Sequence, residues 1–74
     1  MTGDCAYKLA MCRMGDTVSF LDHGQVQQGQ VVGWTSEHTG MPMMLVYGDY
    51  HSDRRVPLHA VLSRGRLGVG VVRF

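Results

Sequence analysis

The feature that most constrains the fold is the alternation of apolar and polar residues that begins near position 16. Val18 and Phe20 point to one side of an extended backbone, and the residues between them point to the other. This period of two is typical of a strand with one buried face. Polar turn signals separate such runs at residues 22–24 (DHG), 37–40 (EHTG) and 51–53 (HSD). The pattern therefore predicts a chain of short antiparallel strands.

The order of these runs predicts an architecture as well as a class. A long hairpin covers 16–34, a nearly apolar strand covers 43–50, and a short strand at 54–56 ends at Pro57. Residues 58–62 (LHAVL) fit a single 3₁₀ turn that leads into a last strand. This arrangement predicts an all-β fold, a small SH3-like barrel of about five strands.

The chain is expected to form one domain with an appendage at each end. The barrel is assigned to 14–64, and the Gly-rich stretch 65–74 is a C-terminal extension that offers an extra edge strand. Residues 1–13 lack a clear period, and they are short for an isolated helix. We expect them to form a loose N-terminal arm, although Cys5, Leu9 and Cys12 would share one face of a helix.

Composition excludes several classes of protein. The net charge of +1 provides no basic field, so nucleic acid is disfavoured as a partner despite the five arginines after position 53, which have Asp53 beside them. No apolar run approaches the ~20 residues that span a bilayer, and no signal peptide is evident, so we expect no membrane association. Two cysteines do not form a disulfide framework, which predicts a cytoplasmic protein with reduced thiols.

Three motifs resemble the type II dihydrofolate reductases, the small plasmid- and integron-borne enzymes of trimethoprim resistance. They are MGDTV at 14–18, QGQVVGW at 28–34 and RRVPLHAVLSR at 54–64. The resemblance covers roughly 14–64, and the heptad is its specific part. It implies an SH3-like barrel that assembles into a homotetramer, with one central pore that holds folate and NADPH. If the family's activity were retained, NADPH would be the cofactor of an oxidoreductase.

The residues that contact ligands in that family are replaced in this chain. Aligned on Pro57, the positions of the pore motif are Arg54, Arg55 and Val56, and these are the candidate ligand-binding residues. Four copies of Arg54 around one pore would repel each other unless they were neutralised. Either the pore binds an anionic small molecule, or Arg54 points to solvent on an edge strand, or the assembly differs. No catalytic residue is assigned.

Four residues are candidates for subunit contacts. The resemblance places Gln27 and Gln28 in the family's interface segment, and it places His51 near an interface histidine; a simple exposed turn histidine is the alternative. Trp34, after a glycine at a strand end, is either an interface anchor or a buried structural residue. No metal site is predicted, because the chain has no C-x-x-C or H-x-x-x-H spacing.

Two functional hypotheses follow. In the first, the chain is an oligomeric relative of type II dihydrofolate reductase whose central pore takes an anionic small molecule. In the second, it is a non-catalytic SH3-like binding or assembly module, encoded on a mobile cassette.

Overall fold

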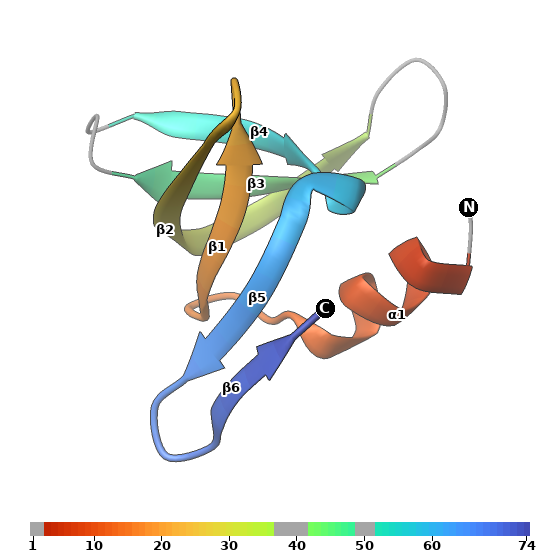
Figure 1. Ribbon diagram of the computed structural model, residues 1–74, viewed down its shortest axis with the longest axis vertical. Coiled ribbons are helices and arrows are strands. Elements are labelled where there is room, and N and C mark those ends of the chain that lie inside the picture. The colour runs from red at the N-terminus through yellow and green to blue at the C-terminus, as the bar shows by residue number, and fades with distance from the viewer. Residues whose placement is uncertain (1–2, 37–41, 49–51) are drawn as a thin grey trace.

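The computed structural model describes residues 3–36, 42–48 and 52–74 (Figure 1). The elements in chain order are α1 (Gly3–Met11), β1 (Thr17–Asp22), β2 (Gln25–Ser36), β3 (Pro42–Gly48), β4 (Asp53–Pro57), the 3₁₀ turn η1 (Leu58–Ala60), β5 (Val61–Arg66) and β6 (Gly70–Arg73).

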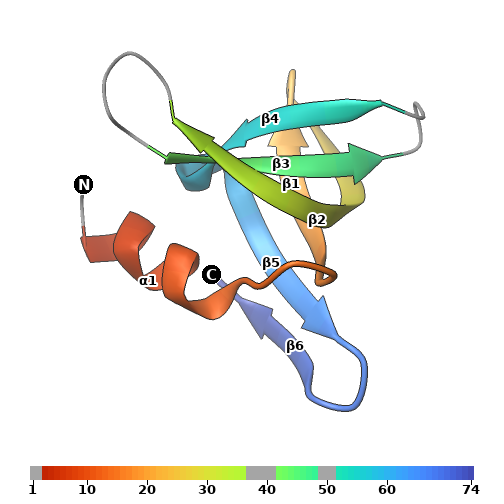
Figure 2. The same cartoon turned by 180° about the vertical axis from the view of Figure 1, so that it is seen from behind.

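All six strands form one antiparallel sheet, in the order β4-β3-β2-β1-β5-β6. The all-β prediction is confirmed. The sheet is open, with β4 and β6 at its two edges. It is also strongly twisted, so that β3 and β4 run across the direction of β1 and β5 in both views (Figures 1 and 2).

One face of this sheet carries the hydrophobic core. Val18 and Phe20 of β1 alternate inward as the sequence pattern predicted, with exposed fractions of 0% and 3%. Met44 and Val46 do the same on β3, where neither is exposed. Val31 and Val61 supply the core residues of β2 and β5, and Leu58 of η1 covers the end of the core. The core is therefore built from the alternation that begins at β1.

The heptad QGQVVGW forms the centre of β2, and its first glycine is required by packing. A Cβ atom on Gly29 would overlap Val46 Cγ1 and would lie 2.7 Å from the carbonyl oxygen of Tyr47. Among the described residues, a Cβ on Gly33 would meet only Leu45 Cδ1, at an ordinary 3.6 Å. Gly29 therefore lets β2 and β3 pack closely.

The register between β2 and β3 shifts between Val31 and Gly33. This shift is a bulge, which bends β2.

The N-terminal segment differs from the loose arm that the sequence predicted. Residues 3–11 form α1, which packs against η1. Cys5 and Cys12 are 5% and 4% exposed, so the face that these cysteines were expected to share is buried against the sheet. Lys8 is also buried, and its Nζ donates to the carbonyl oxygen of His59 at 3.4 Å. Tertiary packing stabilises a helix that is too short to persist alone.

The extension after position 64 completes the sheet. β5 turns through a short hairpin, in which the N–H of Val69 donates to the carbonyl oxygen of Arg66 at 3.0 Å, and β6 returns along β5. The C-terminal Phe74 reaches α1, where its ring meets that of Tyr7 edge-to-face at 5.9 Å. The two ends of the chain are thereby held together. Of the helices in the described ranges, none has the length and apolar character needed to cross a membrane.

Candidate functional site: a charged pocket beside the β1–β2 turn

A tight turn positions the first side chains of the site. Asp22 pairs with Gln25 at the end of the β1–β2 hairpin, which leaves a two-residue loop. Both loop residues have positive φ, 49° at His23 and 80° at Gly24, as a type I′ turn requires. The sequence DHG supplies this conformation, because glycine adopts it without strain and histidine tolerates it. The turn presents His23 to solvent and holds Asp22 at its base.

The start of β4 supplies the second half of the site, and its register separates the three predicted ligand-binding residues. Arg54 pairs with Val46. Val56 pairs with Met44 and is only 3% exposed, so Arg54 and Val56 share the core face. Arg55 lies between them and projects from the opposite face. Val56 is therefore part of the core, and only the two arginines remain to contact a ligand.

These two segments form an open pocket, lined by Asp22, His23, Ser52, Asp53, Arg54 and Arg55. Across it, Arg54 Nη1 lies 2.7 Å from Asp22 Oδ2. His23 Nε2 lies 3.6 Å from the other oxygen of Asp22, and this contact becomes an ion pair when the imidazole is protonated. The pocket thus has two carboxylates and two guanidiniums at its wall. Its arginines can donate charge-assisted hydrogen bonds to a carboxylate or a phosphate.

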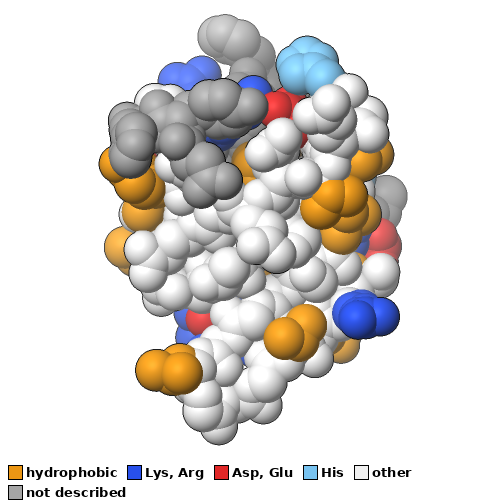
Figure 3. Space-filling model, turned by 60° about the vertical axis from the view of Figure 1, so that its left-hand side comes forward, with side chains coloured by type: hydrophobic (Ala, Val, Ile, Leu, Met, Phe, Trp, Pro, Cys, Tyr) orange, Lys and Arg blue, Asp and Glu red, His pale blue; other side chains and the backbone are white. Residues whose placement is uncertain are grey.

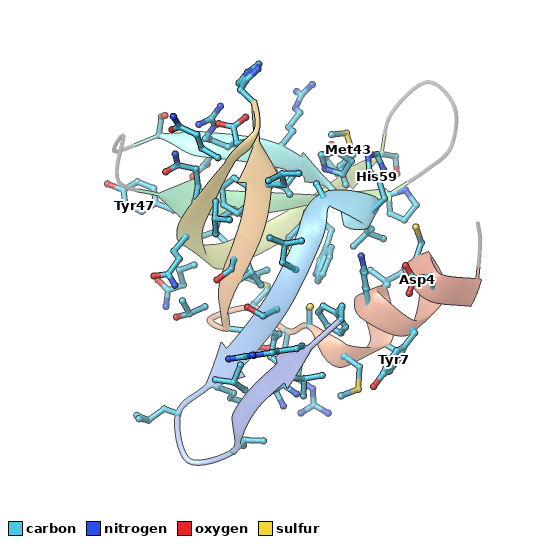
Figure 4. The ribbon with its side chains drawn as sticks, in the orientation of Figure 1. Asp4, Tyr7, Met43, Tyr47 and His59 are labelled. Carbon is cyan, nitrogen blue, oxygen red and sulfur yellow. The ribbon has the colours of Figure 1, made fainter. Side chains whose placement is uncertain are left out.

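The predicted interface residues lie in different surroundings. Gln27 pairs with the core residue Phe20 and is half-buried, whereas Gln28 is exposed and its Nε2 donates to Ser19 Oγ at 3.4 Å. Trp34 is half-buried and packs against the core. His51 lies outside the described residues. Figure 4 shows Tyr47 projecting from the β3 side of the sheet, away from α1.

A second cluster of charges lies on the other side of the molecule, where the loop between α1 and β1 meets β5. Asp16 is 3% exposed and receives a bidentate pair from Arg66, with Nε–Oδ1 and Nη2–Oδ2 distances of 2.7 Å each. The N–H of Arg13 also donates to Oδ2, at 2.9 Å. Arg64, 3% exposed, lies with its Nε 4.0 Å from the same oxygen, and this Nε has no hydrogen-bond partner among the described residues. This cluster joins the loop before β1 to β5.

The electrostatics of this cluster follow from its geometry. The hydrogen bonds from Arg66 hold the pKa of Asp16 below its ordinary value, against the opposing effect of burial. Burial raises the pKa of the Cys12 thiol, and the carboxylate of Asp16 raises it further. Lys8 and the two arginines oppose that rise. Cys12 therefore stays a neutral thiol at neutral pH, which is not the state of an activated nucleophile.

The cysteines do not pair with each other. Cys5 lies in α1 and Cys12 follows its last residue, and no disulfide joins them. Among the described residues, no group of three or more His, Cys, Asp or Glu side chains is placed to hold a metal ion.

The sequence singles out Arg54 and Arg55 but not Asp22, which is the counter-ion of Arg54. Asp22 was assigned only to a turn, and nothing local in the sequence links it to Arg54, thirty-two residues further on. No protein-family model matches the chain, and none of the curated proteins or solved structures gives a significant match.

Proposed function

We propose that this chain is a self-associating SH3-like binding module that takes a small anionic molecule in the pocket formed by Asp22, His23 and Ser52–Arg55. The observation that carries the proposal is the position of Arg54 and Arg55 at the wall of an open pocket, on an edge strand. Each chain then has its own binding site. Catalysis is not part of the proposal.

The strand order supports the SH3-like part of the proposal. Without β6, the order is β5-β1-β2-β3-β4, so the first and last of the five strands are neighbours. The 3₁₀ turn η1 links β4 to β5, and the bulge in β2 lets that strand serve both halves of the sheet. A 3₁₀ turn before the last strand is part of the SH3-like order that the sequence predicts.

The charges of the pocket define the ligand's chemistry. The carboxylate of Asp22 lies 2.7 Å from Arg54, and Asp53 also lines the pocket, so two carboxylates balance its two guanidiniums. A singly or doubly charged carboxylate or phosphate suits this balance better than a polyanion, which Asp22 and Asp53 would repel.

A second candidate is the shared pore of the type II dihydrofolate reductases, with NADPH as cofactor. The position of Arg54 and Arg55 on an edge strand favours it, because edge strands of several copies can meet at one axis. The Asp22–Arg54 pair also removes the repulsion that four converging arginines would create. Against it, Val56 is buried in the core, so the run that corresponds to the pore motif does not present three side chains to a ligand.

The melting temperature with added anions tests the proposal. Phosphate, citrate, NADPH and dihydrofolate are added separately to the full chain at pH 6, and the proposal predicts that at least one of them raises the melting temperature. The shift should disappear in R55A. It should persist in R73A, the matched control, because Arg73 is an exposed arginine on the opposite edge strand. If none of the four shifts the melting temperature, the proposal is wrong.

The stoichiometry separates the two candidates. Calorimetric titration should give one ligand per chain if each pocket acts alone, and one or two ligands per tetramer if the site is a shared pore. Survival of cells on trimethoprim when they express the chain would support the second candidate, because it requires reductase activity.

A further inference from the structure

The two edges of the sheet differ in how they are protected against pairing with another strand. β4 carries Asp53, Arg54, Arg55 and Pro57, and charges and proline on an edge strand discourage pairing. β6 has the sequence GVVR, with a single charge, and Val71 is 69% exposed. Its hairpin adds Leu67 and Val69, which are 102% and 64% exposed. Figure 3 shows apolar side chains at the lower end of the molecule, where Figure 1 places this hairpin.

The hydrogen-bonding direction of β6 shows which backbone groups face outward. The N–H of Phe74 donates to the carbonyl oxygen of Leu62 on β5, at 2.9 Å. N–H groups of successive strand residues point to opposite sides, so the N–H of Val72 also faces β5, and those of Val71 and Arg73 face away from it. The free edge of β6 thus offers the donors and acceptors of two alternate residues.

We propose that β6 pairs with β6 of a second copy of this chain, antiparallel and about a two-fold axis that passes between the two Val72 residues. Val71 of each copy then lies opposite Arg73 of the other, in hydrogen-bonded pairs that exchange both backbone bonds. The two arginines do not face each other, so this register places no like charges directly opposite. The sheets of the two copies become continuous, and each Val71 side chain gains Arg73 of the other copy as its cross-strand neighbour.

This inference rests on the self-association in the proposed function and names the surface responsible for it. The pairing leaves both β4 edges, with their pockets, at the far ends of the dimer. One four-residue strand per copy buries less than the ~800 Å² per partner of a standard interface, so the dimer should dissociate on dilution.

Charge substitutions at Val71 test both the surface and the register. V71K places a lysine opposite Arg73 of the other copy, whereas V71E places a carboxylate there. Sedimentation velocity over a range of concentrations should show a dimer dissociation constant for V71K about tenfold or more above that of V71E, because the changed pair occurs twice per dimer. Wild type should fall between them. Melting temperatures establish that both variants are folded.

Val26 provides the matched control, because it is an exposed valine, 61% exposed, on β2 at the other end of the molecule. V26K and V26E should both dimerise as wild type does. If V71K and V71E shift the dissociation constant equally, the register is wrong, and if only the Val26 variants shift it, the surface is wrong. In either case self-association itself stands. A wild-type chain that stays monomeric at millimolar concentration overturns the inference. Ligand binding by each chain is tested separately, by the change in melting temperature with added anions.

Discussion

Replacing Asp16 with asparagine should remove a large part of the stability of this small domain. The carboxylate is 3% exposed and accepts both bonds of the Arg66 fork at 2.7 Å, with the buried Arg64 beside it. Without the negative charge, two guanidiniums remain next to each other with no counter-ion. Removing one partner of a buried ion pair typically costs about 3–5 kcal/mol. At about 0.05–0.15 kcal/mol per residue, the whole chain should have only about 4–11 kcal/mol of stability.

The same substitution at Asp22 is the control. Asp22 also lies 2.7 Å from a guanidinium, that of Arg54, but its side chain is 22% exposed and that of Arg54 is 31% exposed. A partly solvated pair of this kind contributes at most about 1 kcal/mol. The two substitutions thus share their chemistry and the length of the broken contact. They differ in the burial of the carboxylate, because Arg66 is 26% exposed and so resembles Arg54.

Thermal denaturation followed by circular dichroism measures both effects. D16N should lower the melting temperature by roughly 12–40 °C and D22N by less than about 8 °C, at 4–8 °C per kcal/mol for a domain of this size. If the D16N chain is already unfolded at 25 °C, the lowering of its melting temperature is at the upper end of this predicted range. Equal destabilisation by D16N and D22N would refute the reasoning, because burial would then not determine the strength of these pairs.

Two further predictions concern packing and pH. G29A should destabilise the fold by about 1–3 kcal/mol, because its Cβ would overlap Val46, whereas G33A should change the free energy of unfolding by less than about 1 kcal/mol. Urea titration of both variants measures these free energies. Similar values for the two variants would contradict the packing argument. Because Arg66 lowers the pKa of Asp16, this carboxylate stabilises the fold above its ordinary pKa of about 4, and the contribution is lost as the pH falls from there through the folded pKa. Melting temperatures between pH 6 and pH 2 should therefore fall steeply for wild type and less for D16N, and parallel curves would show that this carboxylate is not responsible.

The alternation in β1 and the turn after it were sufficient to predict where the sheet begins and which residues of β1 are buried. Val18 and Phe20 are in the core, and the DHG turn joins β1 to β2. Both depend on residues close in sequence, because strand periodicity and type I′ turns are local properties. The 3₁₀ turn expected within 58–62 is likewise present as η1 (Leu58–Ala60).

The N-terminal helix could not be predicted in the same way. Its intrinsic tendency to form is weak, and what stabilises it lies at the other end of the chain: the ring of Phe74 against Tyr7, and the carbonyl oxygen of His59 for Lys8. The partnership of Asp16 with Arg66 spans fifty residues in the sequence and has no local signal either.

The candidate site was partly predictable for a related reason. Arg54 and Arg55 stand out as adjacent charges before Pro57. Their separation onto opposite faces follows from the pairing with β3, and it is this register that buries Val56. The ion pair with Asp22 depends on the twist that brings the β1–β2 turn toward β4. Neither can be read from a single segment.

The most direct test of the proposed binding function is an NMR titration of the ¹⁵N-labelled full chain at pH 6 with inorganic phosphate and with NADPH. We predict that the amide signals that move in a saturable way belong to residues 22–24 and 52–55, and that they saturate at one ligand per chain. Saturable shifts confined to another region, or no saturable shift with either ligand, would contradict the assignment of this pocket.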